Sequence, residues 1–524
     1  MNNSSHKIAV SMGRGTLFGV VAGLTMIGTR LITVPIIISH LGLAGYGIWS
    51  IIMTTSAYMR FGTAGLKSAF QKYVAQATGD GNYERANQLI TTGSAGMLVL
   101  SIIGLSPVAI FSKSLAKMAG VPSEFVSSTA SAFTILALIM ILSNFAAVFE
   151  AIVSGCHRLD LVKKFYIATA LFEAISIVTC MFLHFGLLAM TMTMAISEVG
   201  LIVCCYLSAA RLLPQVHIGW RYISAAVVPE LIRFAGSYQL VNVMEILYSS
   251  ILPFGILRMF GARAAGVYAI CTRMTGAANS IQEASLLPLL SGGTMLYASQ
   301  AKEQIRQMMK KTFKWTLVVT LSPLGFVAIF GPTLILAWTR QTDPMIRTGL
   351  WFLCIASAFS AISRTGLILY RARGGALMDV LRQILTISVL LITILIGKKI
   401  GYFGMLEGLA VAEMIGAGFM LHALKKTVDG FHPSVLLPDA AKVILAISVV
   451  LVASMLTIAI PIPWNAGEQP MAWFRLGLAG AACAMMAWPA MALTKCLSGD
   501  EQQAILDIFF PYRKKMIVEP NSAD

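Results

Sequence analysis

Two stretches of this sequence read alike: LGLAGYGIWSI at residues 41–51 and FGARAAGVYAI at residues 260–270. Aligned on each other, they match Gly42 with Gly261, Gly47 with Gly266, Trp49 with Tyr268 and Ile51 with Ile270. Chance could produce such a match in a glycine-rich membrane protein. However, each stretch joins one long apolar segment to the next, so the pattern favours an internal repeat whose glycine-flanked turn connects two helices.

The composition around these stretches is that of a membrane protein. Of the 524 residues, 57% are apolar and 12% are charged, and the mean hydropathy is +0.78. Soluble domains carry about 25% charged residues. A soluble multidomain enzyme and a disordered chain are therefore both excluded.

Long apolar runs predict the number of membrane spans. A transmembrane helix needs about 20 mainly apolar residues, and lipid forces each span to satisfy its own backbone hydrogen bonds. We expect an all-α polytopic protein with fourteen spans at residues 15–39, 44–62, 89–112, 128–153, 164–184, 187–210, 234–257, 265–290, 315–337, 348–369, 381–397, 401–424, 441–461 and 472–494.

The distribution of basic residues predicts the orientation. The net charge is +16, and most of the 39 Lys and Arg fall in every second connecting segment, beginning with the N-terminus. Cytoplasmic loops carry such an excess. We expect a bacterial inner (plasma) membrane protein with both termini in the cytoplasm. The positive charge does not indicate nucleic-acid binding, because the sequence lacks a phosphate-binding glycine loop and zinc-finger spacing.

The same patterns give the expected organisation and argue against a cofactor. The repeat places helix 1 on helix 7, which predicts two parallel six-helix lobes at residues 1–212 and 234–427. Residues 213–233 would form a cytoplasmic connector, and residues 428–524 two extra helices and a tail.

The eight cysteines form no CxxC pair and the seven histidines no HExxH, so we expect neither a metal site nor a catalytic one.

Five arginines fall within or near the predicted spans, and one of them, Arg475, opens the last span and is expected to anchor it at the outer face. A charge in hydrocarbon costs about 2.5–3.5 kcal/mol and persists where it faces protein or a water-filled cavity. Arg30 and Arg273 are candidates for binding an anionic substrate, with pairing to a buried Glu as the alternative. Arg60 and Arg364 lie nearer span ends, where snorkelling to the surface is the competing explanation.

Four of the acids in the spans are the candidates for ion coupling. They are Glu173, Glu198, Glu245 and Glu283. A proton or sodium could bind them during transport, and interhelical structural bonds are the alternative.

These residues resemble a known family. RGTLFG at 14–19, the turn at 41–51, PELIRFAGSY at 229–238, the turn at 260–270 and LPLLS at 287–291 are similar to Wzx-type polysaccharide-biosynthesis flippases of the multidrug/oligosaccharidyl-lipid/polysaccharide (MOP) exporter superfamily. The resemblance implies two six-helix lobes in a V around a central cavity, with alternating access. In related lipid II flippases, arginines on helices 1, 2 and 8 line a cationic cavity, and Arg30, Arg60 and Arg273 fall on those helices here.

The function implied is transport of an undecaprenyl-pyrophosphate-linked oligosaccharide (an O-antigen, capsule or exopolysaccharide unit) from the inner to the outer leaflet of the bilayer. A cation-coupled multidrug exporter of the same fold is the first alternative, although Arg30 disfavours cationic substrates. A membrane glycan polymerase or ligase is the second. It would need a long outer loop with catalytic side chains, and the longest one here, residues 113–127, contains no His.

Overall fold

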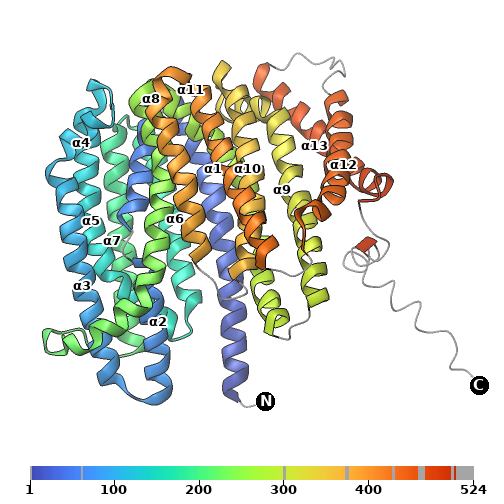
Figure 1. The fold of residues 1–524 in the computed structure, drawn as a ribbon. Helices are drawn as coiled ribbons and strands as arrows, with labels where there is room; N and C mark the ends of the chain where they lie inside the picture. The colour runs from blue at the N-terminus through green and yellow to red at the C-terminus, as the bar shows by residue number, and fades with distance from the viewer. Residues whose placement is uncertain are drawn as a thin grey trace, which may run out of the picture. The chain divides into compact units, whose positions relative to one another are not determined.

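The computed structural model describes residues 3–60, 63–298, 302–371, 377–427, 431–457, 467–496 and 501–502, and these residues form helices and connecting loops without any strand. The ends of two predicted spans, at 61–62 and 458–461, and nearly all of the predicted C-terminal tail lie outside the described residues. Among these described residues, eleven helices are long and apolar enough to cross a membrane. They are α1 (Asn3–Met59), α3 (Tyr83–Ile110), α5 (Ser123–Gly155), α6 (Leu159–Phe182), α7 (Gly186–Leu212), α8 (Val228–Ala298), α9 (Lys302–Thr339), α10 (Pro344–Arg371), α11 (Leu377–Thr427), α12 (Leu437–Leu456) and α13 (Glu468–Leu493) (Figure 1).

Three of these helices each supply two spans. The apolar parts of α1, α8 and α11 are 43, 43 and 49 residues long, about twice what a bilayer requires. Each is broken at one glycine, Gly42 (φ +66°), Gly261 (φ +84°) or Gly401 (φ +76°), with ψ near 180°. Only glycine adopts this conformation readily. The eleven helices therefore contain the fourteen predicted segments, and the predicted all-α polytopic fold is confirmed.

The two copies of the repeat pack against each other. A Cβ atom on Gly47 would lie 2.2 Å from the carbonyl oxygen of Ala262, and one on Gly266 would lie 2.0 Å from the carbonyl oxygen of Leu43. The backbones of α1 and α8 thus touch at the two glycines that the sequence alignment made equivalent. Small residues permit such close approach of membrane helices.

The chain divides into two compact units. Unit 1 comprises residues 1–271 and 379–409, and unit 2 comprises residues 272–378 and 410–524. In unit 1, α5 packs against both α3 and α7, and α1 packs against α6. In unit 2, α9 packs against α10, α12 and α13. The boundaries fall inside α8 and α11, and the six-helix lobes inferred from the repeat stay a prediction.

The structure adds detail to the predicted loops. A polar helix, α2 (Thr63–Asp80), precedes α3, and a short helix, α4 (Ser112–Met118), follows it. The basic stretch from residue 302 continues directly into α9, because Ile305, Met309 and Phe313 are buried in a core cluster there. Residues 213–227 are irregular apart from two 3₁₀ turns, and they are bound to α3 by Asn87, whose Oδ1 accepts from the His217 amide at 3.0 Å.

Candidate functional site

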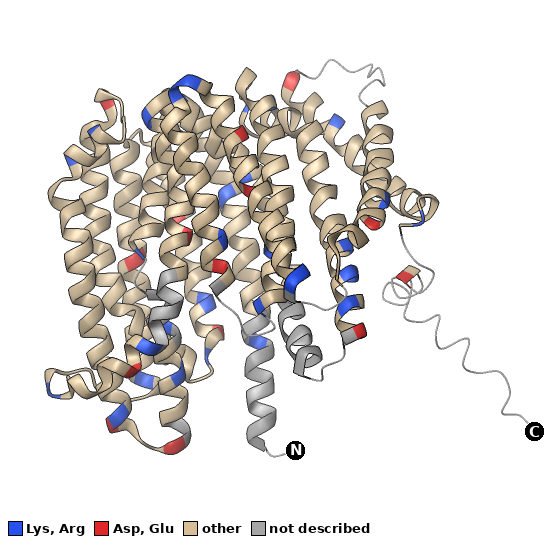
Figure 2. Ribbon diagram, viewed as in Figure 1, with Lys and Arg blue, Asp and Glu red and all other residues tan. Residues whose placement is uncertain are grey.

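A small polar cavity lies inside unit 1, where the end of α1 meets α2, α5, α6 and α7. Its volume is about 190 Å³. We call it the polar cavity. Its lining residues are Arg60, Lys67, Ser143, Asn144, Ala146, Ala147, Glu150, Tyr166, Glu198, Leu201, Ile202 and Cys205. Four of them are charged, whereas charged side chains along α3 and α5 otherwise occur only toward the helix ends (Figure 2).

Asn144 fixes the position of Arg60. The Asn144 side chain is buried, and its Nδ2 donates to the carbonyl oxygen of Met59 at 2.9 Å and to Ser101 Oγ at 3.0 Å. Met59 is the last residue of α1, and the final carbonyls of a helix lack partners within it. Asn144 therefore satisfies one of these carbonyls and holds the backbone immediately before Arg60.

Arg60 forms an ion pair with one of the predicted coupling acids. Its Nη2 lies 2.6 Å from Glu198 Oε2, and the hydroxyl of Ser143 donates to the other carboxylate oxygen, Oε1. The Glu198 side chain is 6% exposed and that of Arg60 is 43% exposed. The acid is thus enclosed, and the guanidinium is reachable from outside the cavity.

A second ion pair lies beside the first. Lys67 from α2 pairs with Glu150 from α5, and the Tyr166 hydroxyl donates to Glu150 Oε1 at 2.9 Å. Each cation at this site is thus matched by a carboxylate.

Two more predicted residues belong to the same electrostatic cluster. The hydroxyl of Ser197, the residue before Glu198, donates to Glu173 Oε1 on α6. The charges of Arg60 and of Arg30 both act on the Glu173 carboxyl. The structure therefore brings together four of the eight predicted site residues: Arg30, Arg60, Glu173 and Glu198.

Arg364 and Glu283 form a separate pair in unit 2. Arg364 Nη1 on α10 pairs with Glu283 on α8, and Arg364 Nε also contacts Ser360 Oγ at 3.3 Å. Next to this pair, Gln282 Nε2 donates to the carbonyl oxygen of Ala361 at 3.0 Å. A predicted substrate-binding cation and a predicted coupling acid thus join α8 to α10.

The remaining two candidates lie apart from both groups. Glu245, exposed on the first segment of α8, accepts from Gln383 Nε2 on α11 at 3.1 Å within unit 1. Arg273 is half-buried in unit 2 and has neither an ion pair nor a side-chain hydrogen bond within the described part of the chain. Arg30 and Arg273 belong to different units, so their joint contact with one substrate stays a prediction.

The sequence analysis missed Lys67, Ser143, Asn144 and Tyr166, although a signal for them exists. Ser143 and Glu150, Tyr166 and Glu173, and Glu198 and Cys205 are each seven residues apart. Seven residues make about two helical turns, so each pair shares one helix face. Polar residues at this spacing in three consecutive apolar helices predict one shared polar site.

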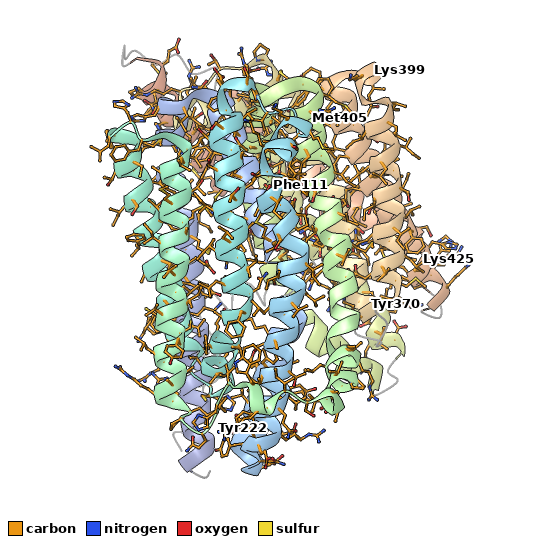
Figure 3. The ribbon with its side chains drawn as sticks, turned by 90° about the vertical axis from the view of Figure 1, so that its left-hand side faces the viewer. Phe111, Tyr222, Tyr370, Lys399, Met405 and Lys425 are labelled. Atoms are coloured by element: carbon orange, nitrogen blue, oxygen red, sulfur yellow. The ribbon has the colours of Figure 1, made fainter. Side chains whose placement is uncertain are left out.

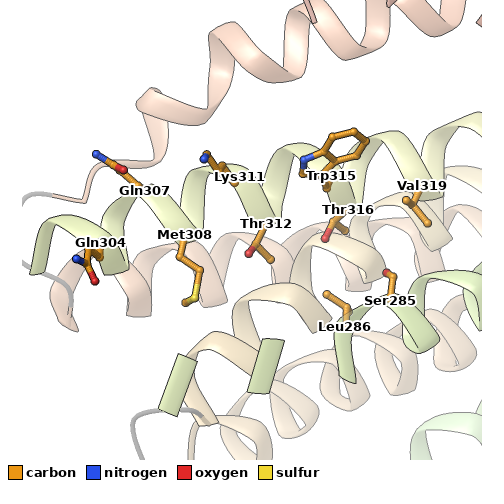
Figure 4. Close-up of a pocket in the computed structure, with 10 residues that line it drawn as sticks. All are labelled: Ser285, Leu286, Gln304, Gln307, Met308, Lys311, Thr312, Trp315, Thr316 and Val319. Atoms are coloured by element: carbon orange, nitrogen blue, oxygen red, sulfur yellow. The ribbon is translucent and has the colours of Figure 1, made fainter. Parts of the chain in front are cut away.

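Unit 2 has a hollow of its own, about 450 Å³ in volume, between the second segment of α8 and the start of α9. Among the described residues that line it, Lys311 is the only charged one, beside Trp315 and Thr316 (Figure 4). None of the predicted site residues lines this hollow.

Comparisons with known proteins agree with this architecture. A family model for polysaccharide biosynthesis proteins matches residues 40–341, more than half of the chain. The chain belongs to the polysaccharide biosynthesis protein family. No curated protein sequence matches it.

Solved structures show the fold. The chain resembles the lipid II flippase MurJ in an inward closed conformation, with a TM-score of 0.71, 12% identity, and coverage of 91% of this chain and 99% of that one. It also resembles an inward-facing multidrug resistance MATE family transporter of the MOP superfamily, with a TM-score of 0.65, 16% identity, and coverage of 77% and 96%. A MOP superfamily transporter from Pyrococcus furiosus Vc1 (DSM3638) matches with a TM-score of 0.55, 15% identity, and coverage of 80% and 94%.

The predicted polysaccharide biosynthesis family is therefore confirmed, and the chain shares the fold of these MOP superfamily structures. The eleven membrane-length helices among the described residues and the fold shared with these structures are those of a multi-pass membrane protein.

Proposed function

We propose that this protein is a flippase for an undecaprenyl-pyrophosphate-linked oligosaccharide, an O-antigen, capsule or exopolysaccharide unit. It would work by alternating access in a bacterial inner membrane, with both termini in the cytoplasm. The observation that carries the proposal is the cluster of Arg30, Arg60, Glu173 and Glu198 inside transmembrane helices of a polysaccharide biosynthesis protein.

The chemistry of the substrate explains why arginines suit this task. A diphosphate and a sugar chain cannot cross about 30 Å of hydrocarbon unaided. Arginine stays charged and donates two parallel hydrogen bonds to a phosphate. A diphosphate that reaches Arg60 would compete with the Glu198 carboxylate for the same guanidinium, so binding and release need not cost a full ion pair.

The roles of the individual residues follow from this proposal. The diphosphate is contacted during the cycle by Arg30, Arg60, Arg273 and Arg364. Glu173 and Glu198, with Glu245 and Glu283, are the candidates for coupling to a proton or sodium gradient, because an acid released from its cation can bind a small cation instead. Arg30 and Arg273 together clamp the diphosphate.

The clamp is tested by combining Arg30→Ala with Arg273→Ala and measuring surface glycan together with the amount of protein in the membrane. We expect export to be lost while the protein remains abundant, and Lys at both positions to restore it only in part. The control is Arg85→Ala with Arg306→Ala, which removes two exposed cations from other sites.

Full export by the Arg30→Ala, Arg273→Ala variant would exclude the clamp. Normal surface glycan after deletion of the whole chain, with increased sensitivity to cationic drugs, would instead establish the multidrug exporter.

A further inference from the structure

Unit 1 contains a second and larger cavity. Its volume is about 720 Å³, and it lies among α1, α3, α4, α5, α8 and α11. We call it the basic cavity. Leu115, Met118, Phe133, Phe254, Arg258 and Lys398 are among the residues that line it. Figure 3 labels Phe111 and Lys399, neighbours of these residues in sequence, toward one end of unit 1 and Tyr222 at the other.

The lining is apolar except for one threonine and two cations. Thr55 is the uncharged polar residue, and no acid is among the described residues that line the cavity. Arg258 and Lys398 are both exposed, and within the described ranges neither has an ion pair or a side-chain hydrogen bond. An apolar chamber with two such cations is complementary to an anion attached to a hydrocarbon chain.

The two cations line the same cavity, and the helices that carry them pack closely beside it. A Cβ atom on Gly397, the residue before Lys398, would lie 2.8 Å from the sulfur of Met259, the residue after Arg258. Gly255, one turn before Arg258, would likewise meet Ile394 of α11 at 2.7 Å. The absence of side chains at Gly397 and Gly255 therefore lets α8 and α11 approach closely beside Arg258 and Lys398.

The backbone of Arg258 is also held from the other side. Gly120, in the turn between α4 and α5, has φ +81°, and a Cβ atom there would lie 2.7 Å from the Arg258 Cα. Three elements thus fix the place of this cation: α8 itself, α11 and the turn after α4.

We propose that the basic cavity receives the phosphate end of the transported lipid on the outer side of the membrane. Arg258 and Lys398 hold the diphosphate, and the first isoprene units lie along the apolar wall. This inference rests on the proposed function. Two neighbouring cations match two linked phosphates, whereas a bulk phospholipid such as phosphatidylglycerol carries one phosphodiester charge. The volume is in the usual range for a ligand site of about 300–1,000 Å³, which suits a diphosphate with part of its chain and leaves the glycan outside.

The test is binding to the purified full-length protein, with a synthetic polyprenyl diphosphate, the matching monophosphate and phosphatidylglycerol as probes. We expect the unaltered protein to prefer the diphosphate. The Arg258→Gln, Lys398→Gln variant should bind it more weakly, by about tenfold or more, because each substitution removes a charge-assisted hydrogen bond to a phosphate. The matched control is Arg221→Gln with Arg347→Gln, which removes two exposed cations elsewhere and should leave binding unchanged.

Each other outcome has a definite meaning. Equal binding of the diphosphate by the Arg258→Gln, Lys398→Gln variant would overturn the inference alone, because the unaltered protein would still bind the proposed substrate. Equal affinity of the unaltered protein for phosphatidylglycerol would assign the cavity to bulk phospholipid and also overturn it. If the unaltered protein binds no polyprenyl diphosphate and its deletion leaves surface glycan unchanged, the proposed function itself fails.

Discussion

The two cavities of unit 1 contain the same kinds of cation in opposite electrostatic settings. In the polar cavity, Arg60 is paired with Glu198 and Lys67 with Glu150. In the basic cavity, Arg258 and Lys398 face an apolar wall with no acid among the described lining residues. An anion entering the polar cavity must therefore compete with a carboxylate, whereas one entering the basic cavity need not. This difference would favour the movement of a bound diphosphate from the polar cavity to the basic cavity.

The first prediction, with the largest expected effect, concerns the sides of the membrane that the two cavities face. The proposed transport requires the polar cavity and the basic cavity to face opposite sides. Single cysteines at positions 80 and 124, in a cysteine-free background, test this directly. Given the positive-inside distribution, we expect an impermeant maleimide to label position 124 in intact cells and position 80 only after lysis.

Labelling of position 80 in intact cells would show that the orientation is the opposite of the predicted one. The proposed direction of transport would then have no support.

The second prediction concerns the stability that each pair of cations provides. Arg60→Ala leaves the buried Glu198 carboxylate without its cation, which we expect to destabilise the protein by about 3–5 kcal/mol and reduce its amount in the membrane. Arg258→Ala should change the melting temperature in detergent little, because it leaves no buried charge.

Addition of Glu198→Ala to Arg60→Ala should recover most of the lost stability, because the unpaired acid is then gone. Arg85→Ala is the control, since its pair with Glu230 is exposed. Equal destabilisation by Arg60→Ala and Arg258→Ala would remove the distinction between the cavities.

The third prediction addresses the packing that connects α1, which ends beside Arg60, to α8, which carries Arg258. Gly47→Ala and Gly266→Ala each force a methyl group against a backbone carbonyl 2.2 or 2.0 Å away. Such overpacking costs about 1–3 kcal/mol, and here the backbones must separate. We expect both variants to lower the melting temperature.

Gly28→Ala is the matched control on α1, because a Cβ atom there meets nothing within 4 Å. Because Ala has the higher helix propensity, Gly28→Ala should leave the melting temperature unchanged or raise it. A fall as large as that of Gly47→Ala would show that the contact between α1 and α8 does not determine the result.

The fold could be predicted from the sequence because it depends on local signals. A long apolar run must form a helix in lipid. Gly42 and Gly261 mark the breaks between helices, because glycine readily adopts the backbone conformation that such a break requires. The candidate site was predicted less completely. Arg60 and Glu198 were each recognisable as charges in apolar surroundings, but their pairing joins residues 138 positions apart through the packing of α1, α5 and α7.

The basic cavity shows what the sequence does not reveal. Arg258 and Lys398 look like ordinary charges at span ends, where snorkelling explains them. Their proximity depends on Gly255 and Gly397, which allow α8 and α11 to approach. No spacing along one helix encodes that contact, so it emerges only from the folded structure.

The smallest expected effect lies in a third charged region, where α2 meets the start of α8. Burial, aided by a hydrogen bond with Glu230, raises the pKa of Tyr73 from 10.0 to about 12. Because the folded state favours the neutral phenol, its contribution to stability is complete below pH 10 and is lost as the pH rises toward 12. We expect the melting temperature of the unaltered protein to fall relative to that of Tyr73→Phe over this interval, and the difference to be constant between pH 7 and 9. Unlike the two cavities, this site would then respond to alkaline pH through a single phenol. A constant difference in melting temperature between the two proteins up to pH 12 would show that Tyr73 ionises equally in the folded and unfolded chains.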